Sequence, residues 1–398
     1  MTAGALVVQS ELPDRSLMSR SAFEFLITGG LTLVLLPLAY FYRKSAGLES
    51  SEYIVSFSAF YAAYLINDPH FSVSYLLFYK NARARFLGPE FHGAQRVRYI
   101  VAGLIVPLAL LVWIVCTMLL QSAQVLGTMV QLMYLLVGWH YVKQGFGVLS
   151  VLSARKGIRF TQHERWVFLA HCFCGWAYAW ASPAETGRDY EEAGVVYSAM
   201  AHPPGLETVA FLLFSASTLA LVVTFVLRLI RRQGLPPLAA TCGYFMSIWL
   251  WTIYSHVDPL MIYVIPALHS LQYWYFVYLL KRNEAKERCE QQSVAIDGFG
   301  PVADFASSPG RFAWRRLGLF FITAVALAWL FFHGIPDVLD ATLVASAASM
   351  GLEPDVSARG LGTTPYLAAF ATFINIHHYF IDHVIWRREN PDLRYLRG

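Results

Sequence analysis

The chain has few charged residues and few cysteines. Asp, Glu, Lys and Arg make up 14% of its 398 residues, whereas a soluble globular domain carries about 25%. So few charges could not cover a globule of this size in water, which excludes an ordinary soluble enzyme and a disordered chain. Five cysteines are too few for a secreted disulfide scaffold. Glycine-rich nucleotide-binding loops are also absent from the sequence, and we expect no nucleic-acid partner.

Long apolar runs take the place of the missing charges. Hydrophobic residues make up 57% of the chain, and the mean hydropathy is +0.47. About 20 apolar residues suffice for a helix to cross a bilayer, and lipid requires each segment to satisfy its own backbone hydrogen bonds. We therefore predict an all-α integral membrane protein with about ten transmembrane helices. The expected spans are residues 23–42, 53–79, 99–120, 125–152, 166–181, 209–230, 237–254, 259–280, 312–332 and 365–386.

The distribution of charge predicts the orientation. Basic residues follow every even-numbered span, and the loops after spans 5 and 9 are acidic. Because cytoplasmic loops are enriched in Lys and Arg, we expect both termini to be cytoplasmic; Arg43 and Lys44 are the exception. Residues 1–22 are polar and precede a full-length span, so we expect no cleavable signal peptide. The chain is interpreted as a single polytopic membrane domain, 1–398, with a cytoplasmic linker at 281–311 between spans 8 and 9.

Histidines lie at one depth in four of the spans. Counting from each histidine to the basic residue after its span gives 10 residues for His70, 15 for His140, 12 for His269 and 9 for His378. These counts correspond to roughly 14–22 Å of helix. One intramembrane histidine is more often a packing residue than a ligand. Four spans at one depth instead predict a shared metal site, with His377 as a further candidate ligand beside His378. His383 is ranked below both.

Polar residues recur at helical spacing from these histidines, where they could support a ligand or take part in chemistry. The candidate supporting residues are Asn67, Gln144, Gln272 and Asn375. The candidate catalytic residues are Asp68, Lys143 and Asp382. Asp68 also precedes Pro69, which predicts a kink in span 2 because proline removes a backbone hydrogen bond.

The donor set restricts the metal. Imidazole-rich sites suit iron, copper, zinc or nickel rather than Mg²⁺ or Ca²⁺. We favour Fe²⁺, with copper or zinc as further candidates, in a non-haem oxidoreductase that uses O₂ on a lipid-soluble substrate. Membrane lipids are the expected surroundings, and a bacterial inner (plasma) membrane is the expected location. Two alternatives stay open: a b-type haem electron carrier with paired histidines, and a transporter with a proton or ion relay through the histidines, Asp68, Lys143 and Asp382.

Two short elements resemble a known family. Asp68-Pro69-His70 is similar to the Pro-His element of the bacterial Brp/Blh family of membrane carotene-cleaving dioxygenases, and His269-Ser270 is similar to its His-Ser element. This resemblance implies ferrous iron held by histidines from several helices. The sequence departs from the family at Phe71, where a glycine is expected, and in its larger number of predicted spans.

Overall fold

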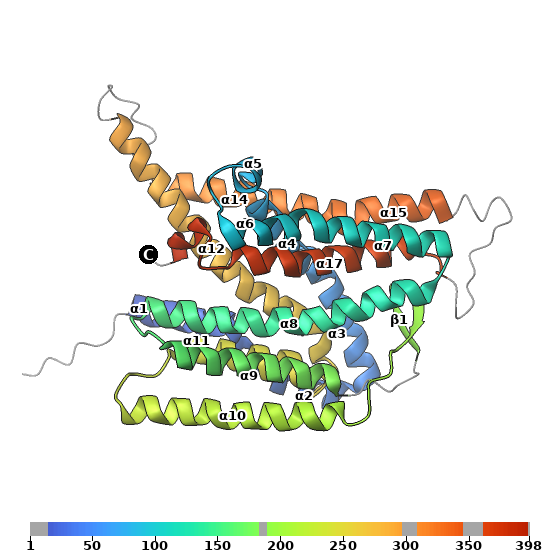
Figure 1. Ribbon diagram of the computed structural model, residues 1–398, viewed down its shortest axis with the longest axis horizontal. Coiled ribbons are helices and arrows are strands. Elements are labelled where there is room, and N and C mark those ends of the chain that lie inside the picture. The colour runs from blue at the N-terminus through green and yellow to red at the C-terminus, as the bar shows by residue number, and fades with distance from the viewer. Residues whose placement is uncertain (1–14, 183–188, 297–308, 345–360, 397–398) are drawn as a thin grey trace, which may run out of the picture.

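The computed structural model describes residues 15–182, 189–296, 309–344 and 361–396. This part of the chain is almost entirely helical, as predicted (Figure 1). The π-helical segments and one final 3₁₀ segment are denoted η below. The elements are α1 (Arg15–Phe25), η1 (Leu26–Gly30), α2 (Leu31–Ala46), α3 (Leu48–Ala63), α4 (Asn67–Phe78), α5 (Ala82–Phe86), α6 (Gly93–Ile100), η2 (Val101–Ile105), α7 (Val106–Leu120), α8 (Ala123–Arg155), α9 (Gln162–Ala181), β1 (Asp189–Glu192), β2 (Val195–Ser198), α10 (Leu206–Ile230), α11 (Leu238–Phe245), η3 (Met246–Ile253), α12 (Met261–Ile296), α14 (Pro309–Trp329), η4 (Leu330–Gly334), α15 (Ile335–Leu339), η5 (Asp340–Val344), α17 (Pro365–Ile385) and η6 (Pro391–Leu396).

Within the described residues, five helices are long and apolar enough to cross a membrane, which indicates a membrane protein. They are Arg20–Ala46, Gly93–Leu120, Ala123–Arg155, Leu206–Ile230 and Arg315–Val344. The other expected spans are also helical, in α3–α4, α9, α11–η3, α12 and α17. α12 and α17 carry histidine, amide and tyrosine side chains among their aliphatic ones.

Span 2 is interrupted, but before Pro69 and not through the lost hydrogen bond on which the predicted kink rested. α3 ends at Ala63 and α4 begins at Asn67. Pro69 lies in the first turn of α4, where its missing N–H leaves no intrahelical hydrogen bond unmade. The break places His70 near the start of a new helix, in the middle of the predicted span.

A short hairpin is the one departure from all-helical structure among the described residues. β1 and β2 pair antiparallel, with Asp189 opposite Ser198. Ala193 and Gly194 form the turn, both with positive φ (48° and 82°), as a two-residue hairpin turn requires. Thr364 donates a hydrogen bond to the carbonyl of Ala193 (2.8 Å), which joins the hairpin to the start of α17.

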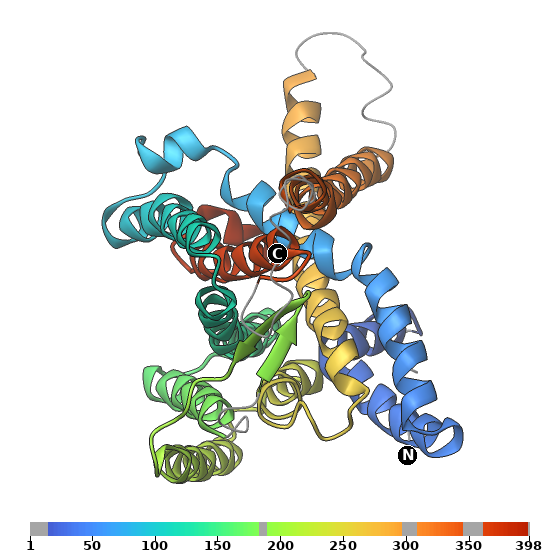
Figure 2. The ribbon, with the colours of Figure 1, turned by 90° about the vertical axis from the view of Figure 1, so that its right-hand side faces the viewer.

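The histidine-bearing helices meet at the centre of the bundle. α17 packs against both α8 and α4, and α12 packs against α4. Viewed along the helices, α17 and α12 lie near the middle, while α7, α10, α14 and the α2–α3 pair are peripheral (Figure 2). The peripheral helices expose aliphatic side chains outward, such as Leu108 on α7 and Leu212 on α10.

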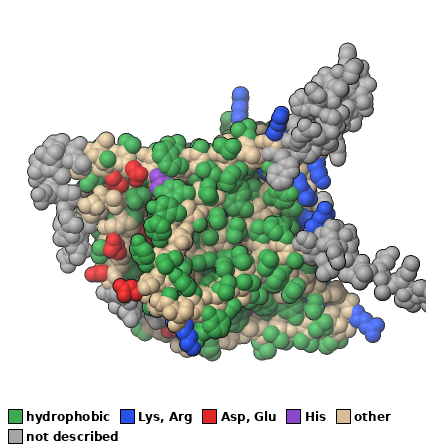
Figure 3. Space-filling view, turned by 180° about the vertical axis from the view of Figure 1, so that it is seen from behind, with side chains coloured by type: hydrophobic (Ala, Val, Ile, Leu, Met, Phe, Trp, Pro, Cys, Tyr) green, Lys and Arg blue, Asp and Glu red, His purple; other side chains and the backbone are tan. Residues whose placement is uncertain are grey.

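Charged side chains separate to the two ends of the molecule. One end carries Lys and Arg, the other carries Asp and Glu, and a broad hydrophobic surface lies between them (Figure 3). Arg43 is the exception noted in the sequence, and its Nε lies 3.1 Å from Oδ2 of Asp258, whose side chain is buried. The misplaced cation is therefore paired with a carboxylate.

Arg85 connects the end of α4 to the C-terminal segment through hydrogen bonds. Its side chain is 1% exposed, and it donates hydrogen bonds to the carbonyls of Leu77 and Phe78 and to the carboxylates of Glu90 and Asp392. Arg85 lies beyond the expected end of span 2. The contacts fix the direction in which α4, and with it His70, runs into the bundle.

We expect Arg85→Met to lower the free energy of unfolding in detergent by about 3 kcal/mol, because it leaves a buried ion network without its cation. Arg83→Met, on the exposed side of the same helix, is the control and should change stability by less than about 0.5 kcal/mol. Denaturant titration of both variants checks this. Equal stabilities would contradict the role given to Arg85.

Candidate metal centre

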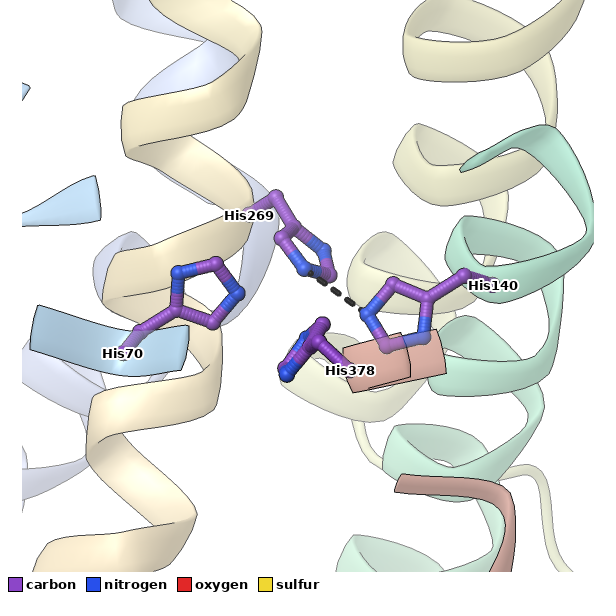
Figure 4. A group of neighbouring side chains, drawn as sticks. All are labelled: His70, His140, His269 and His378. Atoms are coloured by element: carbon purple, nitrogen blue, oxygen red, sulfur yellow. Dashed lines mark hydrogen bonds between the residues drawn. The ribbon is translucent and has the colours of Figure 1, made fainter. Parts of the chain in front are cut away.

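Four histidines from four helices converge on one point. His70 comes from α4, His140 from α8, His269 from α12 and His378 from α17, and their rings point toward one another (Figure 4). One nitrogen of each ring lies within 4.8 Å of the corresponding nitrogen in every other ring. All four residues are at most 5% exposed. The structure therefore gathers the four histidines that the sequence places at one depth.

Several ring nitrogens of the four histidines lack hydrogen-bond partners among the described residues. Nε2 of His70 and both ring nitrogens of His378 accept or donate no hydrogen bond within the described residues. Nε2 of His140 and Nε2 of His269 lie 3.1 Å apart, so at most one of them carries a proton between them. Buried nitrogens without partners cost free energy. Lone pairs that converge in this way are the donor set for a transition metal ion.

The far nitrogen of His70 is held in place. Its Nδ1 lies 2.5 Å from the backbone carbonyl of Asn67 and 3.0 Å from the hydroxyl of Ser270. Donation from Nδ1–H to the carbonyl leaves Nε2 unprotonated and turned to the other rings. This is the arrangement that metal-ligating histidines require of their surroundings.

Aromatic rings surround the histidines. Tyr141 packs against His269 with ring centroids 4.4 Å apart, Tyr379 lies 4.9 Å from His140, and Phe71 lies 4.7 Å from His378. Phe71 also contacts Phe332 of η4 at 5.3 Å. These rings restrict the imidazoles to one orientation and surround them with apolar material.

A second layer of polar side chains lies one helical turn beyond the histidines of α4, α12 and α17. Ser74, Tyr273 and Asp382 follow His70, His269 and His378 by four residues. The Ser74 hydroxyl lies 2.7 Å from the Tyr273 hydroxyl. Both hydroxyls donate to Oδ1 of Asp382, over 2.7 and 3.2 Å. Residues four apart share a helix face, so three helices that align their histidines also align this layer.

The second carboxylate oxygen of Asp382 faces the histidines. Oδ2 lies 3.6 Å from Nε2 of His378 and 3.9 Å from Nε2 of His140. It has no hydrogen-bond partner within the described part of the chain. Asp382 thus turns one carboxyl oxygen toward His378 and His140 and is held in place through its other oxygen.

His377 is not part of the group, although it is adjacent to His378. Its Nδ1 lies 2.8 Å from the Tyr75 hydroxyl, and its Nε2 lies 3.0 Å from the carbonyl of Ala102. Both nitrogens are therefore used in packing between α17, α4 and η2. His383 also lies apart, with its Nε2 accepting a hydrogen bond from Arg387.

Two of the three candidate catalytic residues lie outside the centre. Asp68 is directed to His333, with Oδ2 3.5 Å from its Nε2. Lys143 lies over the ring of Phe173 on α9, with 5.9 Å between its Nζ and the ring centroid. Side chains two residues apart point in different directions around a helix, which separates Asp68 from the nearby His70. Asp382 is the one candidate catalytic residue that reaches the histidines.

The predicted supporting residues lie near the histidines but bind other groups. Gln144 donates to the backbone carbonyl of His269 (3.1 Å) and to the side chain of Gln272 (2.8 Å). Gln272 in turn donates to the carbonyl of Thr28. Asn375 accepts from the Tyr379 hydroxyl (3.0 Å) and so positions the ring that packs on His140.

Asn67 supports His70 through its backbone carbonyl, and its side-chain oxygen accepts from Ser270 (3.0 Å). The sequence did not predict a supporting role for Ser74, Ser270 or Tyr273. The four-residue spacing from the histidines was the signal that could have found Ser74 and Tyr273.

We expect His378→Ala to abolish metal binding and His377→Ala to retain it. The reason is that the first removes a converging donor, whereas the second removes only a packing contact to Tyr75 and Ala102. Metal content per folded chain, measured after purification in detergent, checks the pair. Loss of metal in both variants at equal folded yield would contradict the assignment of His378 alone.

We expect Asp382→Asn to weaken metal affinity by about 10–100-fold, the usual effect of removing a group that supports ligands. Asp68→Asn is the matched control, because that carboxylate pairs with His333 instead, and its affinity should stay unchanged. Chelator competition measures both. An Asp382 variant with native affinity would remove this carboxylate from the site.

A scan against protein-family models, a search of curated proteins and a search of solved structures found no match to this chain. The interpretation of the centre therefore rests on its own residues: four buried imidazoles with converging nitrogens and one adjacent carboxylate.

Proposed function

We propose that the protein is a membrane-embedded metalloenzyme in which His70, His140, His269 and His378 hold one non-haem iron ion. The reaction is the oxidation of a lipid-soluble substrate, with O₂ as the oxidant. The observation that carries this proposal is the convergence of four buried imidazoles whose nitrogens lie within 4.8 Å of one another. Copper or zinc would suit the same donors, and iron is preferred because ferrous iron with open positions binds and activates O₂.

The charge distribution supports ten spans with both termini in the cytoplasm. The ten predicted segments correspond to helices or helix pairs, and Lys and Arg gather at one end of the molecule (Figure 3). Under the positive-inside rule the basic end faces the cytoplasm. We propose that the membrane is the inner membrane of a bacterium. In this proposed arrangement the histidines lie within the hydrocarbon layer.

The residues beside the ion have separate tasks. Asp382 would offset the positive charge of an ion held beside His378 and His140, and its Oδ2, which has no hydrogen-bond partner among the described residues, can accept a proton. Tyr273 and Ser74 fix that carboxylate through Oδ1. Phe71 and Tyr141 exclude water from the rings on which they pack.

The position of the centre favours an apolar substrate. Acyl chains, quinones, sterols and carotenoids dissolve in the layer where the histidines lie, whereas sugars and peptides would need an aqueous path. The sequence resemblance to carotene-cleaving dioxygenases selects carotenoids as the first compounds to test.

The spacing of the rings favours a single ion over a haem. Neighbouring ring centroids within the group of four histidines lie 4.7–5.3 Å apart. This spacing leaves no space for a flat macrocycle between the rings. A relay through Asp68 and Lys143 is also disfavoured, because neither side chain reaches the four histidines.

We expect about one iron per chain and no Soret band in detergent-purified protein. With lipid-soluble compounds and O₂, the native protein should consume O₂ and His70→Ala should not. Metal analysis, a visible spectrum and an oxygen electrode give the three readouts. A Soret band would replace this proposal with the haem carrier, and a metal-free protein would replace it with the transporter.

A further inference from the structure

A separate group of polar side chains lies where α3, α4 and η4 meet. It consists of Tyr64 at the end of α3, Asp68 in the first turn of α4 and His333 of η4. The Tyr64 ring stacks on the His333 ring, with centroids 4.4 Å apart and 14° between the planes. Three segments of the chain thus contribute to one polar site outside the group of four histidines.

These three side chains do not satisfy one another. The Tyr64 hydroxyl lies 3.5 Å from Nδ1 of His333, and Nε2 of His333 lies 3.5 Å from Oδ2 of Asp68. Ordinary N–H···O hydrogen bonds span about 2.7–3.2 Å. Nε2 of His333 has no hydrogen-bond partner within the described residues. The Asp68 carboxylate, in a residue that is 8% exposed, accepts no hydrogen bond from the described part of the chain either. Polar groups buried in this way cost free energy until a partner is present.

Exposed aromatic rings extend from this site along α3. Tyr53, Phe57 and Tyr61 are each at least 52% exposed, and their ring centroids follow one another at 6.1 and 4.7 Å. The row continues from Tyr61 to Tyr64 at 6.5 Å. Residues three or four apart share a helix face, so these rings form one stripe. Because α3 lies at the periphery of the bundle (Figure 2), the stripe faces the surroundings of the protein.

The polar site adjoins the histidines without including them. The ring of Phe332, the neighbour of His333 in the chain, lies 5.3 Å from the ring of Phe71. The ring of Phe71 lies 4.7 Å from that of His378. Two phenylalanine rings therefore separate the polar site from the four histidines, and a ligand could bind there without displacing any of them.

The rings and the polar groups together select one class of lipid-soluble ligand. Flat conjugated rings stack on aromatic side chains, and acyl chains and sterols have no such ring. A hydrocarbon polyene has no atom that could satisfy a carboxylate or an imidazole. A quinone has a flat ring whose carbonyl oxygens accept hydrogen bonds from a hydroxyl or an imidazole N–H, and its reduced form has hydroxyls that donate to a carboxylate.

We propose that Tyr64, Asp68 and His333 bind the headgroup of a membrane quinone, with its apolar tail along the exposed rings of α3. The proposal adds a ligand site beside the metal centre. It requires α3 to face lipid, and it does not depend on which ion the four histidines hold.

The full chain is placed in phosphatidylcholine nanodiscs and titrated with decylubiquinone, a quinone with a short saturated tail. Native mass spectrometry then measures the bound fraction. We expect one saturable site. His333→Leu should weaken the affinity about 10-fold or more, because a hydrogen-bond donor to the headgroup is lost. Tyr64→Phe keeps the stacked ring and removes only the hydroxyl, and it should weaken the affinity about 3-fold or more.

Each variant has a matched control. His202→Leu removes a histidine that packs on Trp180, with ring centroids 4.5 Å apart, in a different part of the chain. Tyr53→Phe removes an exposed hydroxyl at the far end of the stripe. Both controls should bind the quinone as the native protein does. Equal affinities in all four variants, each shown to be folded by its size-exclusion profile and thermal unfolding, would overturn the proposal.

Two further measurements complete the test. Metal content of the same samples should be native in every variant, so a failure of the quinone site is distinguishable from a failure of the metal centre. 1-Decanol, which has a comparable tail and no ring, is then added as a competitor to the native protein. Resistance to displacement supports recognition of the headgroup. Displacement at concentrations comparable to the quinone would overturn it in favour of a site for apolar tails.

Discussion

The structure depends on one constraint: polar nitrogens buried in an apolar interior must find partners. Four imidazoles enter the centre of the bundle, and several of their nitrogens have none among the described residues. Leaving such groups unpaired costs free energy, and hydrocarbon around the protein makes the cost larger. A bound cation would remove this cost at all four rings at once. Its binding would also be linked to folding, because the four helices that carry the rings are distant in sequence.

The second polar layer is subject to the same constraint, because its buried polar groups also need partners. Asp382 is anchored through one oxygen by Ser74 and Tyr273 and presents the other to His378 and His140. A buried carboxylate is stable when a positive charge lies close by. The ion would supply that charge, and the carboxylate would strengthen the hold of the ligands on the ion. Histidine layer and carboxylate layer therefore form one structural unit, built from a four-residue repeat on three helices.

Much of this centre could be predicted from sequence, because depth in a membrane can be counted. His70, His140, His269 and His378 lie at similar distances from basic residues, and the structure brings them together. The direction in which a side chain points around its helix could not be predicted by counting depth. His377 and His378 are neighbours with equal depth, yet His377 is held by Tyr75 and Ala102. Asp68 differs from Asp382 for the same reason, since packing decides which side chain turns inward. The hairpin was missed because its four-residue strands have no apolar repeat.

The most direct test of whether these four histidines hold one ion is X-ray absorption at the metal edge of the purified, metal-loaded protein. The account predicts a single metal environment with about four imidazole nitrogens, and a loss of that signal in His378→Ala but not in His377→Ala. A shell with sulfur ligands, or with fewer than three imidazoles, would contradict the claim that these four histidines hold one ion.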